Sequence, residues 1–142
     1  MDYFALEPEV AGELGEHTEM DTSVHPPLVT RLHYEIGYGW GGDELLESFP
    51  CYIVTETLAN RLTNAGLTGF QLLDVEVTFD EDAAEEHAGE AVPRFRWLVV
   101  TGRPGTEDLG ITDKAQIVVS AKALDVLRTG RLDRCDVEQF AA

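Results

Sequence analysis

The sequence predicts an α+β domain in which two short helices pack on a mostly antiparallel sheet. Three observations support this fold class: short segments alternate apolar with polar residues, two segments carry apolar residues at helical spacing, and one strand–helix–strand pattern occurs twice. Of the 142 residues, 44% are hydrophobic and 26% charged, as is ordinary for a globular domain. We expect residues 1–142 to form a single domain, with an acidic and partly irregular segment at 1–30.

The N-terminal part shows few regular patterns. Residues 1–6 predict a short strand, whereas residues 8–27 are polar and acidic and predict an irregular segment. Residues 31–36 predict a half-buried strand, because apolar and polar side chains alternate there. The glycine-rich residues 37–42 predict a loop. A helical turn is expected at 44–47.

Residues 51–79 show a clearer order. Residues 51–54 predict an apolar strand, and Thr55 can cap a helix by accepting a backbone N–H of the first turn. Gly66 stands where a helix ends in the left-handed conformation. Residues 69–79 then predict one strand. The apolar positions at helical spacing between the cap and the glycine are Leu58, Ala59, Leu62 and Ala65.

The second half of the chain repeats this order. Residues 80–90 and 102–114 predict loops on either side of a strand at 94–100, in which Arg94 and Arg96 are expected to face Asp74 and Glu76. An apolar strand at 117–119, a Ser120 cap, a helix ending near Gly130 and a final strand at 135–140 follow. With an offset of 65 residues, Thr55 falls on Ser120, Leu62 on Leu127, Leu67 on Leu132 and Leu72 on Val137. The sequence thus predicts a duplicated unit.

The net charge of −17 is unevenly distributed. Residues 1–90 contain 20 acidic residues and two bases, Arg31 and Arg61, whereas residues 91–142 contain seven acids and eight bases. Nucleic acid and anionic membranes are therefore unfavourable partners, since both require a basic face. A basic protein fits better, because complementary charge steers association. The alternative is that the acidity only keeps the protein in solution.

The sequence offers no recognisable catalytic or metal site, and we expect no cofactor. The four histidines have no second histidine or cysteine at ligand spacing, and Cys51 has no local base that would activate it. Both cysteines are expected to be reduced thiols, consistent with a cytoplasmic protein. His33 and Glu35 share a strand face and could form an acid–base pair, although a solvated face is the simpler interpretation.

Two acidic segments and one aromatic residue are the candidate partner-binding sites. The acids at 80–90 and 7–21 could bind a basic partner, and Trp40 in its glycine-rich loop could anchor an interface, unless it belongs to the core. The predicted partner-binding residues are Trp40, Asp43, Glu44, Asp80, Glu81, Asp82, Glu85 and Glu86.

Two resemblances add to this interpretation. The run Phe49-Pro-Cys-Tyr-Ile-Val-Thr-Glu-Thr-Leu-Ala, with Gly66-Leu-Thr-Gly-Phe after it, resembles small uncharacterised actinobacterial proteins, as do Phe95-Arg-Trp-Leu, Asp108-Leu-Gly and Ile117-Val-Val-Ser. The C-terminal strand–Ser–helix–strand is similar to the ending of immunity proteins of bacterial polymorphic toxin systems. This second resemblance covers only about 25 residues, by pattern alone. It implies a non-enzymatic inhibitor that binds a secreted toxin.

Three hypotheses follow. The first is a binding protein whose acidic surface captures a basic protein, such as a toxin neutralised in the cytoplasm. The second is a small enzyme or ligand-binding domain with a site near His33, Glu35 and Trp40. The third is a structural subunit of a larger complex. The sequence leaves the oligomeric state undetermined.

Overall fold

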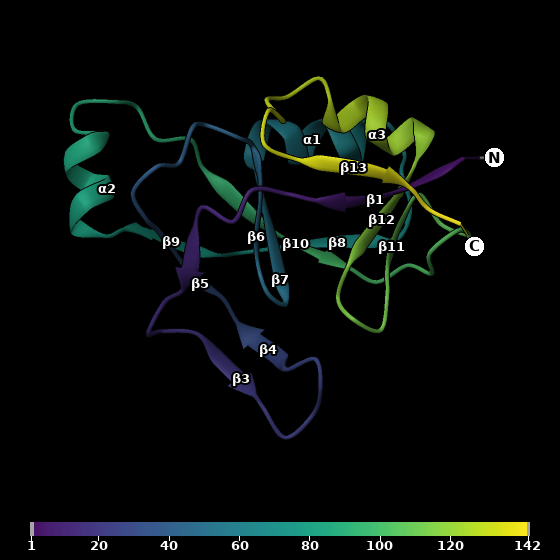
Figure 1. Ribbon diagram of the computed structural model, residues 1–142, viewed down its shortest axis with the longest axis horizontal. Coiled ribbons are helices and arrows are strands. Elements are labelled where there is room, and N and C mark those ends of the chain that lie inside the picture. Colours follow the sequence, from purple (N-terminus) through teal and green to yellow (C-terminus); the bar gives the residue numbers. More distant parts are fainter. Residues whose placement is uncertain (1, 142) are drawn as a thin grey trace.

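The computed structural model describes residues 2–141 and has the α+β fold that the sequence predicts. Most strand pairs are antiparallel, and two of the helices, α1 (Glu56–Asn64) and α3 (Ala121–Leu127), lie side by side (Figure 1). A third helix, α2 (Glu81–Glu86), lies apart from them at one end of the molecule (Figure 1). No helix within residues 2–141 is long and apolar enough to cross a bilayer.

Two four-stranded sheets have the same internal order. Each contains a hairpin, then a strand from elsewhere in the chain, then the strand that follows the helix. The first sheet has the order β6 (Leu45–Ser48), β7 (Cys51–Thr55), β10 (Phe95–Val100) and β8 (Phe70–Leu73). The second has the order β11 (Leu109–Ile111), β12 (Ile117–Ser120), β1 (Tyr3–Glu7) and β13 (Asp136–Gln139).

The predicted duplication is visible in the strand register. We call β6, β7, α1 and β8 the first unit, and β11, β12, α3 and β13 the second unit. The strand that precedes each unit is exchanged: β1 completes the sheet of the second unit, and β10 completes that of the first. Equivalent residues are paired in both sheets. The corresponding pairs are Phe95–Thr55 and Tyr3–Ser120, and Leu98–Leu72 and Leu6–Val137.

Both predicted helix caps are confirmed. The Leu58 N–H donates to Thr55 Oγ1 at 3.3 Å, and the Ala123 N–H donates to Ser120 Oγ at 3.1 Å. Each hydroxyl in turn donates to a carboxylate, Thr55 to Glu44 at 2.8 Å and Ser120 to Asp108 at 2.9 Å. Because both cap residues are buried, their hydroxyls serve structure and are not free nucleophiles.

The two units share one core. Their helices and the inner faces of both sheets bury Leu62 and Leu127, which occupy equivalent positions and are both 0% exposed. Gly66 has the predicted left-handed backbone, with φ +70. Gly130 packs closely against the first unit, since a Cβ there would lie 2.8 Å from a Glu44 carboxylate oxygen.

A third layer covers the other face of the first sheet. It consists of α2, a sheet with the order β2 (Gly12–Leu14), β5 (His33–Ile36) and β9 (Glu76–Phe79), and the projecting hairpin of β3 (Glu19–Asp21) and β4 (Leu28–Arg31) (Figure 1). Strands β5 and β9 are parallel. A second core, which includes Tyr34, Ile36 and Trp97, fills the space between this layer and the first sheet.

Several expected boundaries are wrong in the first half. The segment 8–27 is not simply irregular but contains β2 and β3, which are too short and polar to show a hydrophobic period. The single strand expected at 31–36 is divided into β4 and β5. The expected helical turn at 44–47 is strand β6, in which Leu45 enters the first core and Leu46 the second. Adjacent apolar residues are typical of a strand buried on both faces.

Other corrections concern residues 69–114. The strand expected at 69–79 is two strands, β8 and β9, because the chain leaves the first sheet after Leu73 and joins the third layer. The expected loop at 80–90 contains α2, which Asp80 caps and whose Ala83 is buried. The loop at 102–114 contains β11.

Candidate functional site

The acidic residues of α2 form the most exposed part of the predicted binding surface. Glu81, Asp82 and Glu85 are exposed, and among residues 2–141 no lysine or arginine forms an ion pair with them. Asp80 is different, since its carboxylate accepts the Ala83 N–H at 2.8 Å as the helix cap. This end of the molecule therefore presents uncompensated negative charge.

A shallow hollow lies beside this helix. Its lining consists of Tyr38, Asp82, Glu85 and Glu86, and Tyr38 is 75% exposed. The Glu86 carboxylate accepts the Gly39 N–H at 3.0 Å, which ties the glycine-rich loop to α2. We call Tyr38, Glu81, Asp82, Glu85 and Glu86 the α2 surface. An aromatic ring among carboxylates suits the stem and head of a lysine or arginine side chain.

Trp40 lies in the second core. It is 7% exposed, its Nε1–H donates to the Asp43 carbonyl at 3.1 Å, and its ring contacts Phe79, Phe95 and His87. This is the core alternative that the sequence analysis left open. Tyr38, two residues earlier, is the exposed aromatic residue of the loop, and sequence reasoning missed it because glycines flank both residues alike.

Asp43 and Glu44 bind groups of the chain itself. The Asp43 side chain accepts the N–H groups of Asp133 and Arg134 at 3.0 and 2.8 Å, and the residue is 1% exposed. The Glu44 carboxylate accepts hydrogen bonds from the Thr55 hydroxyl and from the Arg131 N–H. Both carboxylates thus join the 41–44 loop to the C-terminal segment. Asp43 therefore satisfies backbone donors about 90 residues away in the sequence.

The N-terminal acidic segment contains one buried carboxylate. Glu9 Oε2 pairs with the Arg134 guanidinium at 3.1 Å, while Oε1 is buried and has no hydrogen-bond partner among residues 2–141. Burial raises the pKa of Glu9 above its ordinary value, against the opposing effect of Arg134. Glu13, Glu16 and Glu19 are exposed by contrast. Glu9 is therefore not one of the exposed acids that segment 7–21 offers to a partner.

Two histidines that are distant in sequence lie in contact. The His17 and His33 rings stack with centroids 4.9 Å apart, and His17 Nδ1 lies 3.0 Å from both carboxylate oxygens of Glu76. The hydrogen bond from His17 lowers the pKa of Glu76. His33 is only 4% exposed, so the solvated strand face expected for it is wrong. The turn at 15–18 covers the ring, which a single-strand pattern cannot reveal.

The suggested site near His33, Glu35 and Trp40 is divided between different surroundings. His33 contacts His17 and Thr78, whereas Trp40 packs with Phe79, Phe95 and His87. Glu35 is paired in the sheet with residues of β2 and β9. The structure therefore favours two separate clusters over one acid–base site.

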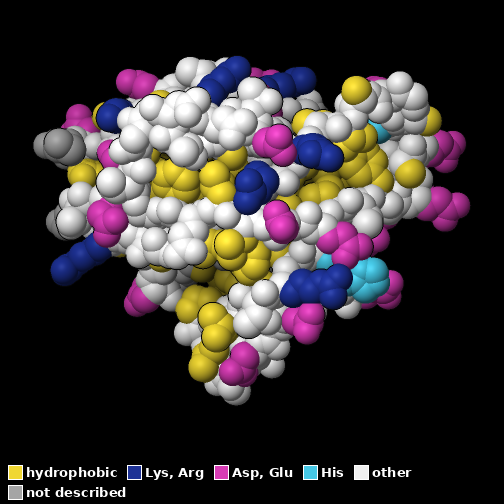
Figure 2. Space-filling model, turned by 180° about the vertical axis from the view of Figure 1, so that it is seen from behind, with side chains coloured by type: hydrophobic (Ala, Val, Ile, Leu, Met, Phe, Trp, Pro, Cys, Tyr) yellow, Lys and Arg dark blue, Asp and Glu magenta, His cyan; other side chains and the backbone are white. Residues whose placement is uncertain are grey.

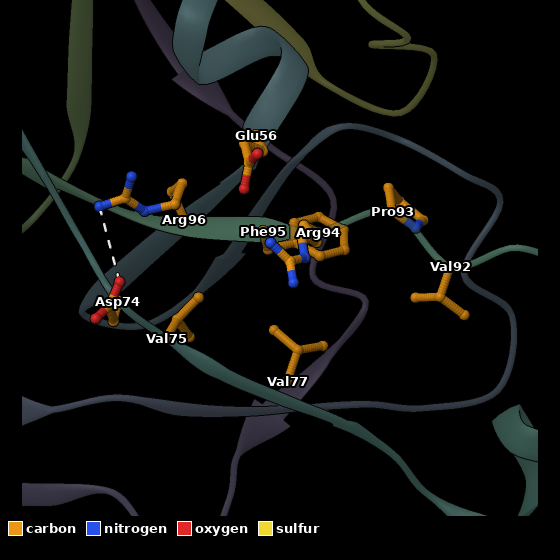
Figure 3. A pocket seen from close by; sticks show the side chains of 9 residues that line it. All are labelled: Glu56, Asp74, Val75, Val77, Val92, Pro93, Arg94, Phe95 and Arg96. Atoms are coloured by element: carbon orange, nitrogen blue, oxygen red, sulfur yellow. Dashed lines mark ion pairs between the residues drawn. The ribbon is translucent and has the colours of Figure 1, made fainter.

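A hollow of about 380 Å³, lined by both apolar and charged side chains, lies between β10 and the segment that leads into β9 (Figure 3). Val75 and Val77 point toward Arg94 and Phe95, and Glu56 enters from the start of α1 (Figure 3). At one edge the Arg96 guanidinium lies 3.9 Å from an Asp74 carboxylate oxygen, which confirms that expected cross-strand pair. Glu76 does not take part, because β9 belongs to another sheet and Glu76 pairs with His17 and Arg31.

The cysteines are poor candidates for nucleophiles. Both are free thiols, Cys51 buried and Cys135 half-buried. Burial raises the pKa of Cys51 to about 12 and that of Cys135 to about 11. A thiol is reactive as its thiolate, so these values keep both side chains in the unreactive form near neutral pH.

Comparison with known proteins found no match, so any inference about function rests on the geometry of this structure. No protein-family model matches the chain, and no curated protein is significantly similar to it in sequence.

Proposed function

We propose that this chain is a non-enzymatic binding protein that captures a basic protein through the α2 surface. The partner that the C-terminal resemblance implies is a protein toxin, which the chain would block in the cytoplasm. The single observation that carries the proposal is the exposed Tyr38 ring beside the carboxylates of Asp82 and Glu85, which have no cationic partner in the described chain.

The physical argument is electrostatic. The acids of α2 add to the strong negative charge of residues 1–90, so they attract a basic surface from a distance. Tyrosine and arginine are enriched among the residues that dominate binding energy, and a tyrosine loses little conformational freedom when it is covered. Tyr38 thus supplies contact area, and the carboxylates orient the basic partner as it approaches.

The experiment is co-purification with the protein encoded beside this one, followed by an affinity measurement. We expect binding to weaken steeply as salt rises from about 0.1 to 0.5 M, because screening shortens the range of charge interactions. Tyr38→Ala, and the pair Asp82→Lys with Glu85→Lys, should each weaken binding by about tenfold or more.

A matched control separates the α2 surface from net charge. Asp125 and Glu138 are exposed acids of the second unit, and Asp125→Lys with Glu138→Lys changes the net charge equally. We expect this control to bind within about twofold of the unaltered protein at about 0.15 M salt, where charges farther apart than about 8 Å are screened. Equal weakening by both pairs would assign the effect to overall charge and contradict the proposed surface.

A further inference from the structure

The third layer brings together two histidines and one glutamate from three segments. His17 lies in the turn at 15–18, His33 begins β5 and Glu76 begins β9. One ligand atom from each of the three lies within 4.8 Å of the others. Figure 2 shows histidine side chains next to a basic side chain and carboxylates, above the projecting hairpin.

We propose that His17, His33 and Glu76 form a binding site for Zn²⁺. Two imidazole nitrogens and one carboxylate oxygen are a donor set that zinc accepts in proteins, with water at the fourth position. The cluster shares no residue with the α2 surface, so a test of the zinc site does not depend on whether the proposed function is correct.

The distances are close to those of a metal centre. Ligand atoms about 2.1 Å from a tetrahedral Zn²⁺ lie about 3.4 Å from one another. His17 Nδ1 lies 3.0 Å from both oxygens of Glu76, so these two ligands already have nearly the required separation. The largest separation, within 4.8 Å, must shrink by at most about 1.4 Å, a movement that the turn carrying the exposed His17 can supply.

A neighbouring hydroxyl fixes the orientation of His33. Its Nε2 lies 2.7 Å from Thr78 Oγ1, and its Nδ1 accepts the His17 backbone N–H at 3.2 Å. Neutral His33 therefore carries its proton on Nε2 and directs the Nδ1 lone pair toward the turn. A ligating histidine usually donates its other ring N–H to such a partner. Zn²⁺ would replace the hydrogen bond from the turn.

The turn itself is shaped to the imidazole ring. A Cβ at position 15 would lie 2.2 Å from His33 Nδ1, so only Gly15 lets the backbone pass this close to the ring. The Thr18 hydroxyl donates to the His33 carbonyl and accepts the His33 N–H. These contacts hold both ends of His33 while leaving the His17 side chain about half exposed.

The surrounding charges permit a cation. Arg31 lies 3.7 Å from Oε1 of Glu76, which leaves Oε2 as the oxygen that faces the metal. Arg31 also lies 3.6 Å from Glu19 and keeps that partner when Zn²⁺ binds. Glu16, next to His17, and the net charge of −17 both attract cations to this part of the chain.

The first test is calorimetric titration of the full chain with ZnCl₂, in excess Mg²⁺ so that exposed carboxylates are occupied by an oxygen-preferring ion. We expect one saturable Zn²⁺ per chain. His17→Ala and Glu76→Gln should each weaken Zn²⁺ binding by about tenfold or more. Even the loss of a residue that only hydrogen-bonds to a metal ligand lowers metal affinity by about tenfold. His25→Ala is the matched control, because His25 is also exposed but lies outside the cluster, and it should bind as the unaltered protein does.

The second test uses the unaltered protein, so it does not depend on any variant folding. Zn²⁺ should shift the imidazole NMR signals of His17 and His33 while those of His25 and His87 stay in place. The proposal is overturned if binding is not saturable, if His17→Ala binds as tightly as His25→Ala, or if the His17 and His33 signals do not move.

Discussion

The first and second units have the same strand order, register and helix caps, but their outer faces differ. We call the side of each sheet turned away from α1 and α3 its outer face. In the first sheet Trp97 pairs with Ile53, and in the second Ala5 pairs with Val118 at the equivalent position. Trp97 belongs to the second core, whereas its small counterpart Ala5 does not. The same strand–helix–strand unit therefore carries a further packed layer on its outer face in the first sheet but not in the second.

Insertions account for this difference. Between the exchanged strand and the hairpin, the first unit has residues 8–44, which contain β2 to β5, whereas the second has only residues 101–108. The longer insertion supplies β2 to β5 of the third layer, and the segment between β8 and β10 supplies β9 and α2. In the second unit Gly110 replaces Leu46, and a Cβ there would lie 2.5 Å from the Pro104 backbone nitrogen. A short loop thus packs directly on that sheet, where only glycine leaves enough room.

The inner faces should respond alike to large-to-small substitution. Leu62→Ala and Leu127→Ala alter equivalent, fully buried residues of the shared core. We expect each to lower the free energy of unfolding by about 2–5 kcal/mol, from lost burial and a residual cavity. Urea denaturation monitored by circular dichroism measures both. A loss below about 1 kcal/mol in one variant only would show that the core is not shared equally.

The helix caps should give a smaller and again equal effect. Thr55→Ala and Ser120→Ala each remove a cap hydroxyl, and with it the hydrogen bond to Oε1 of Glu44 or to Oδ1 of Asp108. We expect a loss of about 1–2 kcal/mol in each unit, measured by urea denaturation. Double-mutant cycles that add Glu44→Gln or Asp108→Asn should show coupling of about 0.5 kcal/mol or more within a unit. Cap substitutions in different units should be additive, and strong coupling between them would contradict two separate caps.

The smallest predicted effect lies in the third layer, at α2, which has no counterpart in the second unit. The hydrogen bond from His87 Nδ1 to Glu90, 2.7 Å long, raises the pKa of His87 above its usual 6.5. A raised histidine pKa stabilises the fold fully below 6.5 and loses that effect as pH rises through the folded-state pKa. Glu90→Gln should therefore lower the melting temperature more at about pH 5.5 than at about pH 9.

This pH effect should correspond to less than about 1 kcal/mol, because the Glu90 carboxylate is largely exposed and solvent screens its interaction with His87. Thermal melts of both proteins across the pH range measure it. His25→Gln serves as the control, since His25 lies in the β3–β4 hairpin rather than near α2. A melting difference that is equal at both pH values would remove the His87–Glu90 pair as its cause.

The candidate sites were only partly predictable. The sequence places acids at 80–90, and the structure shows that α2 exposes four of them, Glu81, Asp82, Glu85 and Glu86. It could not separate Tyr38 from Trp40, since burial in a glycine-rich loop depends on which element packs over it. The contact of His17 with His33 was equally invisible, because a turn and a strand 16 residues apart meet only through folding.

The sequence by itself determined the two units of this protein: the alternation of the strands, the caps Thr55 and Ser120, and the 65-residue offset that relates them. These features follow from local periodicity and from hydrogen bonds between residues that are three positions apart in the sequence. Only the tertiary structure decided the exchange of β1 and β10, the third layer and the uses of Asp43 and Glu44. Their partners are far away in sequence, and the free energy of such contacts depends on which surfaces remain to be covered.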